Sequence, residues 1–235
     1  MTKKNVAVIG ANGRMGQEIS RLLQASSDLR ASLGIVRNGQ AAGFERSAHG
    51  LKKKDFKDID VVIDFSSLEN FDDNLHFFSE EKIPLVSGVT GLSQKQFSNI
   101  EKSSKHSAVL WAPNMSLGVA VLAKALSAIQ GVKGFDFQIE EFHHNKKKDN
   151  PSGTALFLQK ELEKIVGKKC SPPIGIRGGG IVGVHRVHMM AENETLSFEH
   201  VATNRKLFAD GAVVAAKFMI KKKSGFFEMK DILEF

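Results

Sequence analysis

Two patterns predict an α/β protein with a doubly wound parallel sheet in its first half and a mixed α+β arrangement in its second half. In the first half of the 235-residue chain, short apolar runs alternate with segments of helical periodicity. In the second half, an extended run precedes a helical segment, and two further strand-like runs follow each other across a polar turn. The two halves therefore differ in architecture.

The first half contains five short apolar runs that predict buried strands. A helix is predicted after the first run, because Met15, Ile19, Leu22 and Leu23 fall on one helical face. Two more helices are expected at about 66–80 and 93–104. The predicted strands are residues 5–9, 31–36, 61–65, 84–87 and 108–111.

The second half has fewer and longer extended runs. Strands are predicted at 135–142, 185–191 and 195–202, and helices at 153–166 and 208–219. The glycine-rich stretch 175–183 is expected to be a loop, because glycine permits backbone angles that other residues resist.

Composition excludes several classes of protein. With 42% hydrophobic and 25% charged residues, and no apolar run near the ~20 residues that a membrane span needs, a globular, cytoplasmic protein without a membrane partner is expected. The single cysteine, Cys170, can form no internal disulfide and predicts no metal site. The net charge of +7 lies largely in three scattered lysine runs without aromatic neighbours, which favours small anions over nucleic acid.

A glycine motif follows the first predicted strand. Gly10-Ala11-Asn12-Gly13-Arg14-Met15-Gly16 lies between that strand and the first helix, where glycines let the backbone approach a pyrophosphate at a helix N-terminus. The motif alone is also compatible with a plain strand-to-helix turn. Its position directly after an apolar strand favours a Rossmann-like dinucleotide site.

The end of the second predicted strand distinguishes between dinucleotides. A carboxylate about 20 residues beyond the glycines usually holds the ribose hydroxyls of NAD. This chain has Val36 and then Arg37, so no acid repels a 2′-phosphate and a guanidinium is available to pair with it. A preference for NADPH is predicted, with an ordinary loop arginine as the alternative.

Two further turns follow strands of the same sheet. Gly88-Val89-Thr90 follows the fourth strand, and Ala112-Pro113-Asn114-Met115 follows the fifth. Ligands of open α/β sheets bind at the carboxyl ends of the strands, so both turns are expected to line the nicotinamide pocket. Either turn alone is equally typical of a glycine turn or a helix cap.

The segment from Glu141 to Ala155, E-F-H-H-N-K-K-K-D-N-P-S-G-T-A, combines acid–base and anion-binding groups. His143 and His144 titrate near neutral pH, and a lysine can pair with a carboxylate or donate a proton. Ser152 is expected to cap the following helix, whose first N–H groups attract carboxylate oxygens. A lysine run is more often a solvated surface, and one of two adjacent histidines is often structural.

These motifs together resemble the 4-hydroxy-tetrahydrodipicolinate reductase (dihydrodipicolinate reductase) family of the diaminopimelate route to lysine. The order and spacing match from residue 6 to about residue 215. The resemblance implies NAD(P)H-dependent reduction of 4-hydroxy-2,3,4,5-tetrahydrodipicolinate, a small dicarboxylate, to tetrahydrodipicolinate. NADPH is the expected cofactor, and NADH a weaker one.

The resemblance also assigns parts and residues. It implies a dinucleotide-binding domain at 1–114, completed by about 206–235, and a substrate-binding and tetramerisation domain at 115–205, in a homotetramer. His143 and Lys147 match the catalytic positions, and His144, Gly153 and Thr154 the substrate-binding ones. The cofactor-contacting positions match Gly10, Ala11, Asn12, Gly13, Arg14, Met15, Arg37, Gly88, Val89, Thr90, Ala112, Pro113, Asn114 and Met115.

Four positions depart from the family pattern. Val36 replaces the acidic residue that lets many members use NADH, which narrows the expected cofactor choice. Gly180 stands where an aspartate is expected, and Val184 and Arg186 stand where the glutamate and threonine of a Gly-Glu-His-Thr segment are expected. The loop contacts of the central domain are therefore in question, while the His-His-Lys core is intact.

Rival interpretations come from other classes. Another Rossmann reductase, acting on an amino or imino acid, would keep the glycine loop and Arg37 but lack the His-His-Lys core. A non-catalytic NADPH sensor would need no proton donor, so the loss of His143 and Lys147 would leave its output unchanged. A DNA-binding role predicts steep salt dependence and has no motif to support it.

Overall fold

The computed structural model describes residues 2–233. The chain divides into two compact units: Met1–Ser116 with Lys206–Phe235, here called the first unit, and Leu117–Arg205, called the central unit. No helix among the described residues is both long and apolar enough to cross a membrane.

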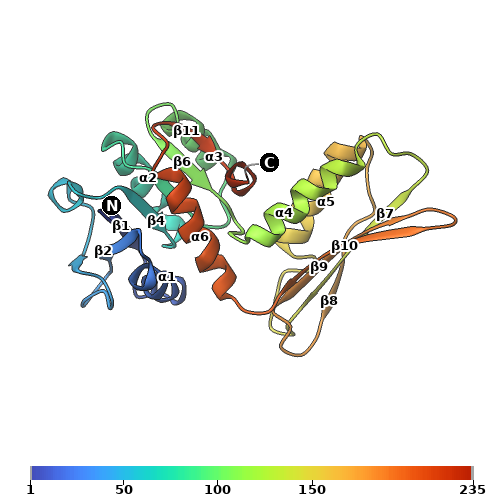
Figure 1. The fold of residues 1–235 in the computed structure, drawn as a ribbon, viewed down its shortest axis with the longest axis horizontal. Helices are drawn as coiled ribbons and strands as arrows, with labels where there is room; N and C mark the ends of the chain where they lie inside the picture. The colour runs from blue at the N-terminus through green and yellow to red at the C-terminus, as the bar shows by residue number, and fades with distance from the viewer. Residues whose placement is uncertain (1, 234–235) are drawn as a thin grey trace. The chain divides into compact units, whose positions relative to one another are not determined.

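The first unit contains a seven-stranded, wholly parallel sheet with the strand order β11-β6-β5-β4-β1-β2-β3 (Figure 1). The order reverses between β1 and β4, which is the switch point where ligands of such sheets bind. The strands are β1 (Lys4–Ile9), β2 (Leu29–Ile35), β3 (Arg46–Ala48), β4 (Val61–Asp64), β5 (Leu85–Ser87), β6 (Ala108–Trp111) and β11 (Gly225–Phe227).

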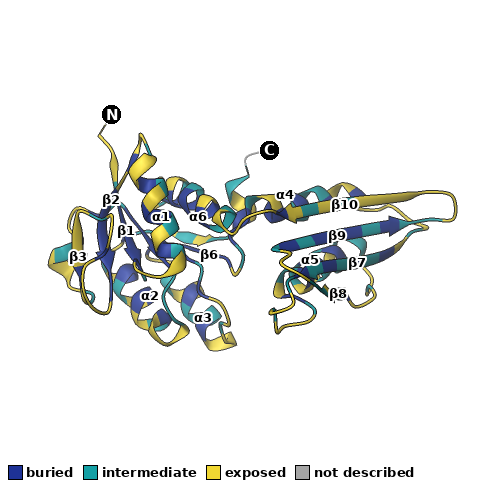
Figure 2. Cartoon of the chain, turned by 90° about the horizontal axis from the view of Figure 1, so that it is seen from below, coloured by how far each residue is buried: buried dark blue, intermediate teal, exposed yellow. Residues whose placement is uncertain are grey.

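Helices cover both faces of this sheet. α1 (Arg14–Ala25) packs on α6 (Lys206–Met219), which contacts β4, β5 and β6, while α2 (Phe71–Glu80) packs on α3 (Gln94–Ser103) on the other face (Figure 2). Three phenylalanines, Phe56, Phe77 and Phe78, meet edge to face beside α2. The doubly wound sheet predicted from the alternating pattern is confirmed.

The two short strands at the edges of this sheet, β3 and β11, were not predicted from the sequence. The five predicted strands correspond to β1, β2, β4, β5 and β6, but β3 and β11 have three residues each and no sequence pattern announced them. The predicted helix 66–80 is a 3-10 turn, Leu68–Asn70, followed by α2. Further 3-10 turns are Lys53–Phe56, Leu126–Ile129 and Met229–Ile232.

The central unit packs two helices on a four-stranded mixed sheet of order β10-β9-β7-β8. The helix α4 contacts β10, and α5 contacts β7. Between the helices and the sheet lies a core that includes Leu126, Leu158 and Val187. The elements are α4 (Leu117–Ala125), β7 (Asp136–His143), α5 (Gly153–Val166), β8 (Ile174–Arg177), β9 (Gly183–Met190) and β10 (Thr195–Ala202).

The two faces of this second sheet differ in burial. Along β9, buried and half-buried residues alternate from Gly183 to Met190, as the alternating colours in Figure 2 show. The helix-covered face carries the buried residues, among them Ile139 and Val187. The other, open face carries Phe142, Ile174 and Ile176, the last two 53% and 41% exposed.

Two predictions for the central unit need correction. The stretch 175–183 is not one loop, because Ile174–Arg177 is a strand whose hydrogen bonds to β7 outweigh the weak strand preference of glycine, and Gly183 begins β9. The helix α4 was not predicted, because its apolar residues occur on all sides and leave no amphipathic period.

Candidate functional site

The predicted cofactor residues gather at one edge of the first unit's sheet. The glycine loop follows β1, Arg37 lies just beyond β2, Gly88–Thr90 follows β5 and Ala112–Met115 follows β6. Because all seven strands are parallel, these four carboxyl ends lie at the same edge. The structure therefore brings together segments that are far apart in the sequence.

The glycine loop has the close packing and the open helix end that a pyrophosphate needs. Gly10 has φ +77°, and a Cβ there would lie 2.8 Å from the carbonyl oxygen of Phe65. A Cβ on Gly16 would lie 2.4 Å from the carbonyl oxygen of Gly10. Gly13 caps α1 without a side-chain hydrogen bond, and the first turn of α1 holds no acid. The residues present fit a dinucleotide phosphate at this helix end.

Val36 and Arg37 have different surroundings. Val36 is buried against Ala11 and Ala41, whereas Arg37 is exposed at the end of β2. The side-chain amide of Asn12 donates to the carbonyl oxygen of Gln40 at 3.1 Å and so ties the glycine loop to the loop after Arg37. A carboxylate at position 36 would have to enter an apolar contact.

Hydrogen bonds from both side chains and backbone fix the other two turns. The indole of Trp111 donates to the carbonyl oxygen of Val89 at 2.7 Å, and the N–H of Ala112 donates to Ser87 at 3.1 Å. Thr90 is exposed, while Val89 and Met115 are buried. Asn114 Oδ1 accepts from the N–H of Ser116 at 2.8 Å, which shapes the turn before α4.

In the central unit, His143 is the last residue of β7 and lies on the helix-covered face. Two positions earlier, on the same face, Glu141 is fully buried. Its carboxylate accepts two hydrogen bonds from Arg177, at 2.7 and 2.8 Å, and one from the N–H of Ser152 at 2.9 Å. His143 Nδ1 also contacts Glu141 Oε2 within hydrogen-bonding distance.

The charges around His143 shift several pKa values. Burial lowers the pKa of His143, the Glu141 carboxylate raises it in part, and the positive charges of Lys147 and Arg177 lower it again. Burial alone would raise the pKa of Glu141, but the hydrogen bonds from Arg177, His143 and Ser152 hold it below its ordinary value. At neutral pH Glu141 is therefore ionised and His143 is mainly neutral.

A second histidine, His185 on β9, completes this buried group. Its ring centroid lies 5.2 Å from that of His143, and its Nε2 lies 3.3 Å from Ser152 Oγ. Burial, and then repulsion from His143 and His200 when these are protonated, lower the pKa of His185 to about 4. His185 therefore stays neutral.

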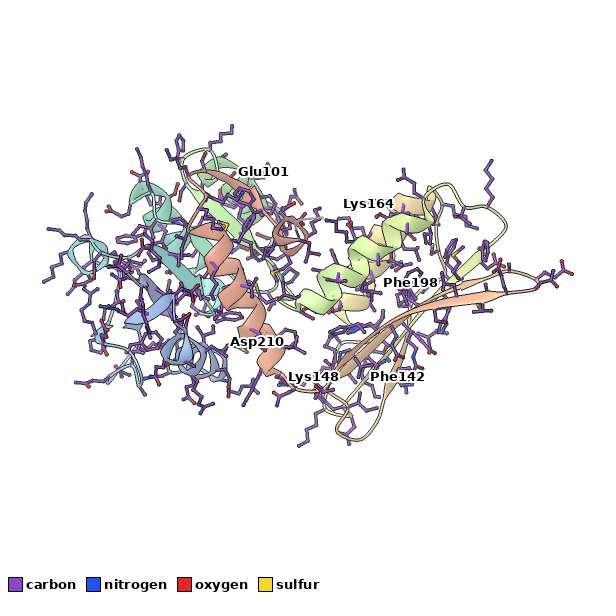
Figure 3. The ribbon with its side chains drawn as sticks, in the orientation of Figure 1. Glu101, Phe142, Lys148, Lys164, Phe198 and Asp210 are labelled. Carbon is purple, nitrogen blue, oxygen red and sulfur yellow. The ribbon has the colours of Figure 1, made fainter. Side chains whose placement is uncertain are left out.

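The other predicted substrate residues lie in the loop after β7 and at the start of α5. Of the three lysines, only Lys147 is half-buried, and it pairs with Asp149 at 2.9 Å, while Lys148, labelled in Figure 3, is exposed. His144 Nε2 accepts from Arg205 Nη2 at 2.9 Å. The Arg205–His144 pair carries a net positive charge near the end of β7, whereas Asp149 balances the charge of Lys147.

The helix α5 begins as the sequence predicted. Ser152 Oγ accepts from the N–H of Ala155 at 3.2 Å, which confirms the N-cap. Gly153 is exposed, and a Cβ there would meet no atom within 4 Å. Thr154 beside it is half-buried. The N–H of Gly153 already interacts with the carboxylate of Asp149, so this first turn attracts an anion from within the chain.

Three of the residues that depart from the family pattern lie outside this buried group. Val184 and Arg186 alternate with Gly183 and His185 on β9, so their side chains lie on the open face. Arg186 pairs there with Glu199 and, at 3.1 Å, with Glu140. Gly180 lies in the exposed turn after β8. None of the three lines the buried histidine group.

Sequence reasoning missed Glu141, Arg177, His185 and Arg205 as site residues. The spacing of Glu141 and His143 was a usable signal, because strand residues two apart share a face. No signal linked Arg177, 36 residues away, to Glu141. Among residues 2–233, no group of three or more histidine, cysteine or acidic side chains is arranged to hold a metal ion.

A doubly wound sheet with a glycine loop at its first turn, in a chain that also carries a buried imidazole–carboxylate pair, defines a dinucleotide-dependent oxidoreductase. The family described as dihydrodipicolinate reductase, N-terminus, matches residues 4–115, and the one described as dihydrodipicolinate reductase, C-terminus, matches residues 118–233. The chain belongs to the dihydrodipicolinate reductase family.

Individual relatives agree with this membership. A 4-hydroxy-tetrahydrodipicolinate reductase of Bdellovibrio bacteriovorus is 44% identical over 99% of this chain and 97% of its own length. One from Campylobacter lari is 36% identical over 97% of this chain and 98% of its own. The dipicolinate-bound dihydrodipicolinate reductase of Paenisporosarcina sp. TG-14 shares the fold, with a TM-score of 0.84 over 99% of this chain and 100% of its own, at 19% identity.

Proposed function

We propose that this chain reduces 4-hydroxy-2,3,4,5-tetrahydrodipicolinate to tetrahydrodipicolinate in the diaminopimelate route to lysine, with NADPH preferred over NADH. The observation that carries the proposal is the buried pair of His143 and Glu141, which lies within residues 118–233, the part of the chain that the C-terminal family model matches. The net reaction consumes one proton and one hydride and releases water. The protein must therefore supply a proton beside a dicarboxylate.

His143 and Lys147 are the proposed proton donors. His143 presents its Nε2 atom on the helix-covered face, with Gly183 beside it. Lys147 is the only half-buried lysine of its run, and its charge lowers the pKa of both His143 and His185. Groups with a pKa near the working pH deliver protons efficiently, and an imidazole suits this role. When bound, the reduced nicotinamide supplies the hydride.

The substrate carboxylates are proposed to bind at the start of α5 and at His144. Gly153 leaves open space at the helix N-terminus, and Thr154 follows it with a hydroxyl. Backbone N–H groups at such an end favour an anion, and Ser152 Oγ already occupies the N–H of Ala155. The guanidinium of Arg205 donates a hydrogen bond to Nε2 of His144 and adds a positive charge beside that histidine.

The NADPH preference rests on Val36 and Arg37. Arg37 is exposed at the carboxyl end of β2, where the ribose of a bound dinucleotide lies in this fold class. A guanidinium there pairs with a 2′-phosphate, and the buried Val36 leaves no carboxylate to hold a 2′-hydroxyl. The contacts of Gly10–Met15, Gly88–Thr90 and Ala112–Met115 are proposed to hold the rest of the cofactor.

A homotetramer, with cofactor bound by the first unit and substrate by the central unit, completes the proposal. Its support is the family resemblance and the open face of the central sheet, where Ile174, Ile176 and Val201 are 53%, 41% and 50% exposed. Apolar side chains in such number favour coverage by another chain. Light scattering tests the tetramer.

The proposed cytoplasmic location rests on the biosynthetic role.

The decisive assay measures oxidation of NADPH and of NADH by the purified protein, with substrate made in place by a synthase from pyruvate and aspartate semialdehyde. We expect oxidation that depends on the synthase and is faster with NADPH. In Arg37→Ala the KM for NADPH should rise about tenfold or more, since one charge-assisted phosphate contact is lost, while the KM for NADH stays unchanged.

Arg30→Ala is the matched control, because Arg30 lies near the start of β2, at the end opposite to Arg37, and pairs with Glu45 at 3.7 Å. It should leave both KM values as in the native protein. Equal effects of the two variants would contradict the role of Arg37. Absence of oxidation with either cofactor would contradict the proposed reaction itself.

A further inference from the structure

The Glu141 carboxylate is fully buried, and both of its oxygens accept hydrogen bonds. It is 0% exposed, Arg177 binds both of its oxygens, and the N–H of Ser152 donates to Oε1. The guanidinium is itself fixed, because Arg177 Nη2 donates to the carbonyl oxygen of Asp149 at 2.6 Å. Glu141 is therefore held rigidly at both oxygens.

This arrangement decides which nitrogen of His143 carries the proton. An ionised carboxylate is only an acceptor, so His143 Nδ1 must donate to Glu141 Oε2. In the neutral imidazole the other nitrogen, Nε2, then has a free lone pair. The orientation follows from the strand, because residues 141 and 143 share one face.

Two glycines make room for this geometry. A Cβ on Gly183 would lie 3.0 Å from His143 Nε2, so the glycine keeps that atom uncovered. A Cβ on Gly175 would lie 2.7 Å from Glu141 Oε1 and 1.8 Å from Asn150 Oδ1, so β8 can approach the carboxylate only with glycine there. Backbone on both neighbouring strands is thus shaped around the pair.

We propose that Glu141, clamped by Arg177 and the Ser152 N–H, is the positioning residue for His143: it fixes the imidazole with its proton on Nδ1, leaves Nε2 to take up and deliver the catalytic proton, and stabilises the imidazolium when it forms. The inference rests on the proposed function, because it assigns His143 the proton transfer. It adds to that function two residues, Glu141 and Arg177, that act through His143.

A purely structural role for Glu141 predicts other behaviour. If the Glu141–Arg177 pair only joined β7 to β8, its loss would lower stability without altering the proton chemistry of His143. The pH profile of kcat/KM and the tautomer of His143 separate the two roles. The charged or titratable groups that face His143 are Glu141 from β7, Lys147 from the next loop, Arg177 from β8 and His185 from β9, with His200 of β10 beside His185.

The test variant is Glu141→Gln, which keeps the shape of the side chain and removes its charge. We expect kcat to fall about 10- to 100-fold, because the variant loses part of the rate enhancement that a general acid contributes. KM should change less than about threefold. The fall of kcat/KM with rising pH should move to lower pH by about one unit or more, because a neighbouring negative charge no longer favours the imidazolium.

The matched control is Glu140→Gln on the same strand. Glu140 also pairs with an arginine and a histidine, Arg186 at 3.1 Å and His188 at 3.2 Å, but on the open face. Light scattering should show both variants in the native assembly. An equal change of kcat and pH profile in both variants would overturn the inference, because charge removal in general would then explain it.

A readout without turnover keeps the inference separate from the proposed function. Nitrogen-15 NMR of the free native enzyme, with His143 assigned by its absence in His143→Gln, should show the proton on Nδ1. In Glu141→Gln the amide can donate to Nδ1, so the proton should move to Nε2. A native Nε2–H tautomer would overturn the inference even if Glu141→Gln failed to fold, whereas missing oxidation in the native enzyme would overturn only the proposed reaction.

Discussion

The two faces of the central sheet carry the same three kinds of side chain in different environments. On the helix-covered face Glu141, Arg177 and His143 form a group whose carboxylate is 0% exposed. On the open face Glu140, Arg186 and His188 form a group whose carboxylate is 26% exposed. Phe142, labelled in Figure 3, separates Glu141 from His143 in the sequence and lies on the open face under Arg186.

The difference shows that burial, more than composition, sets what such a group does. Water screens the ion pairs of Glu140 and lets its side chain move. Exposed ion pairs of this kind contribute little to the free energy of unfolding. Glu141 has lost that water and depends on its partners, which fixes the position of each atom. We therefore expect function and stability to depend on the covered group and to tolerate changes in the open one.

The largest difference is expected in activity. His143→Gln removes the proposed proton donor, so kcat should fall about 10²- to 10⁴-fold. His188→Gln removes the histidine of the open group and should leave kcat within about twofold. Steady-state oxidation of NADPH with synthase-generated substrate measures both. Similar losses in the two variants would remove the distinction between the faces.

A smaller difference is expected in stability. Glu141→Ala leaves Arg177, whose side chain is 15% exposed, without its buried counter-ion and should reduce the free energy of unfolding by about 3–5 kcal/mol. Glu140→Ala should cost less than about 1 kcal/mol, since its partners remain hydrated. Urea unfolding at neutral pH, followed by circular dichroism, compares the two. A loss for Glu140→Ala as large as that for Glu141→Ala would contradict this account.

The smallest expected effect is a pH dependence that arises from His185 on the covered face. Its pKa falls from 6.5 to about 4 on folding, mainly through burial. Below about pH 6.5 the unfolded chain therefore binds a proton that the folded one does not, and stability is lost until the pH reaches about 4. At ~1.4 kcal/mol for each tenfold change in proton affinity, the loss from this residue is at most about 3–4 kcal/mol.

His185→Gln should remove this part of the pH dependence. The difference in unfolding free energy between about pH 7.5 and pH 5, measured by urea titration, should be smaller in the variant than in the native protein. An identical difference in both would mean that His185 takes no part in the acid loss of stability. Burial of His185 would then not lower the free energy of unfolding at acidic pH.

The sequence by itself determined the doubly wound sheet, the glycine loop and the cap of α5. Each depends on neighbouring residues, such as the apolar run before Gly10 or the side chain of Ser152 that accepts from Ala155. The family also followed from local motifs, because E-x-H-H-x-x-K and P-S-G-T-A are continuous in the chain.

Tertiary structure alone decided where the charges of the site are satisfied. Strand periodicity places Glu141 and His143 on one face, but only the pairing of β7 with β8 brings in Arg177, within a stretch whose glycines predicted a loop. Burial of His185 and exposure of Arg186, one residue apart, likewise follow from which face α5 covers. Contacts between distant segments set burial, and burial sets the pKa values that a sequence pattern leaves open.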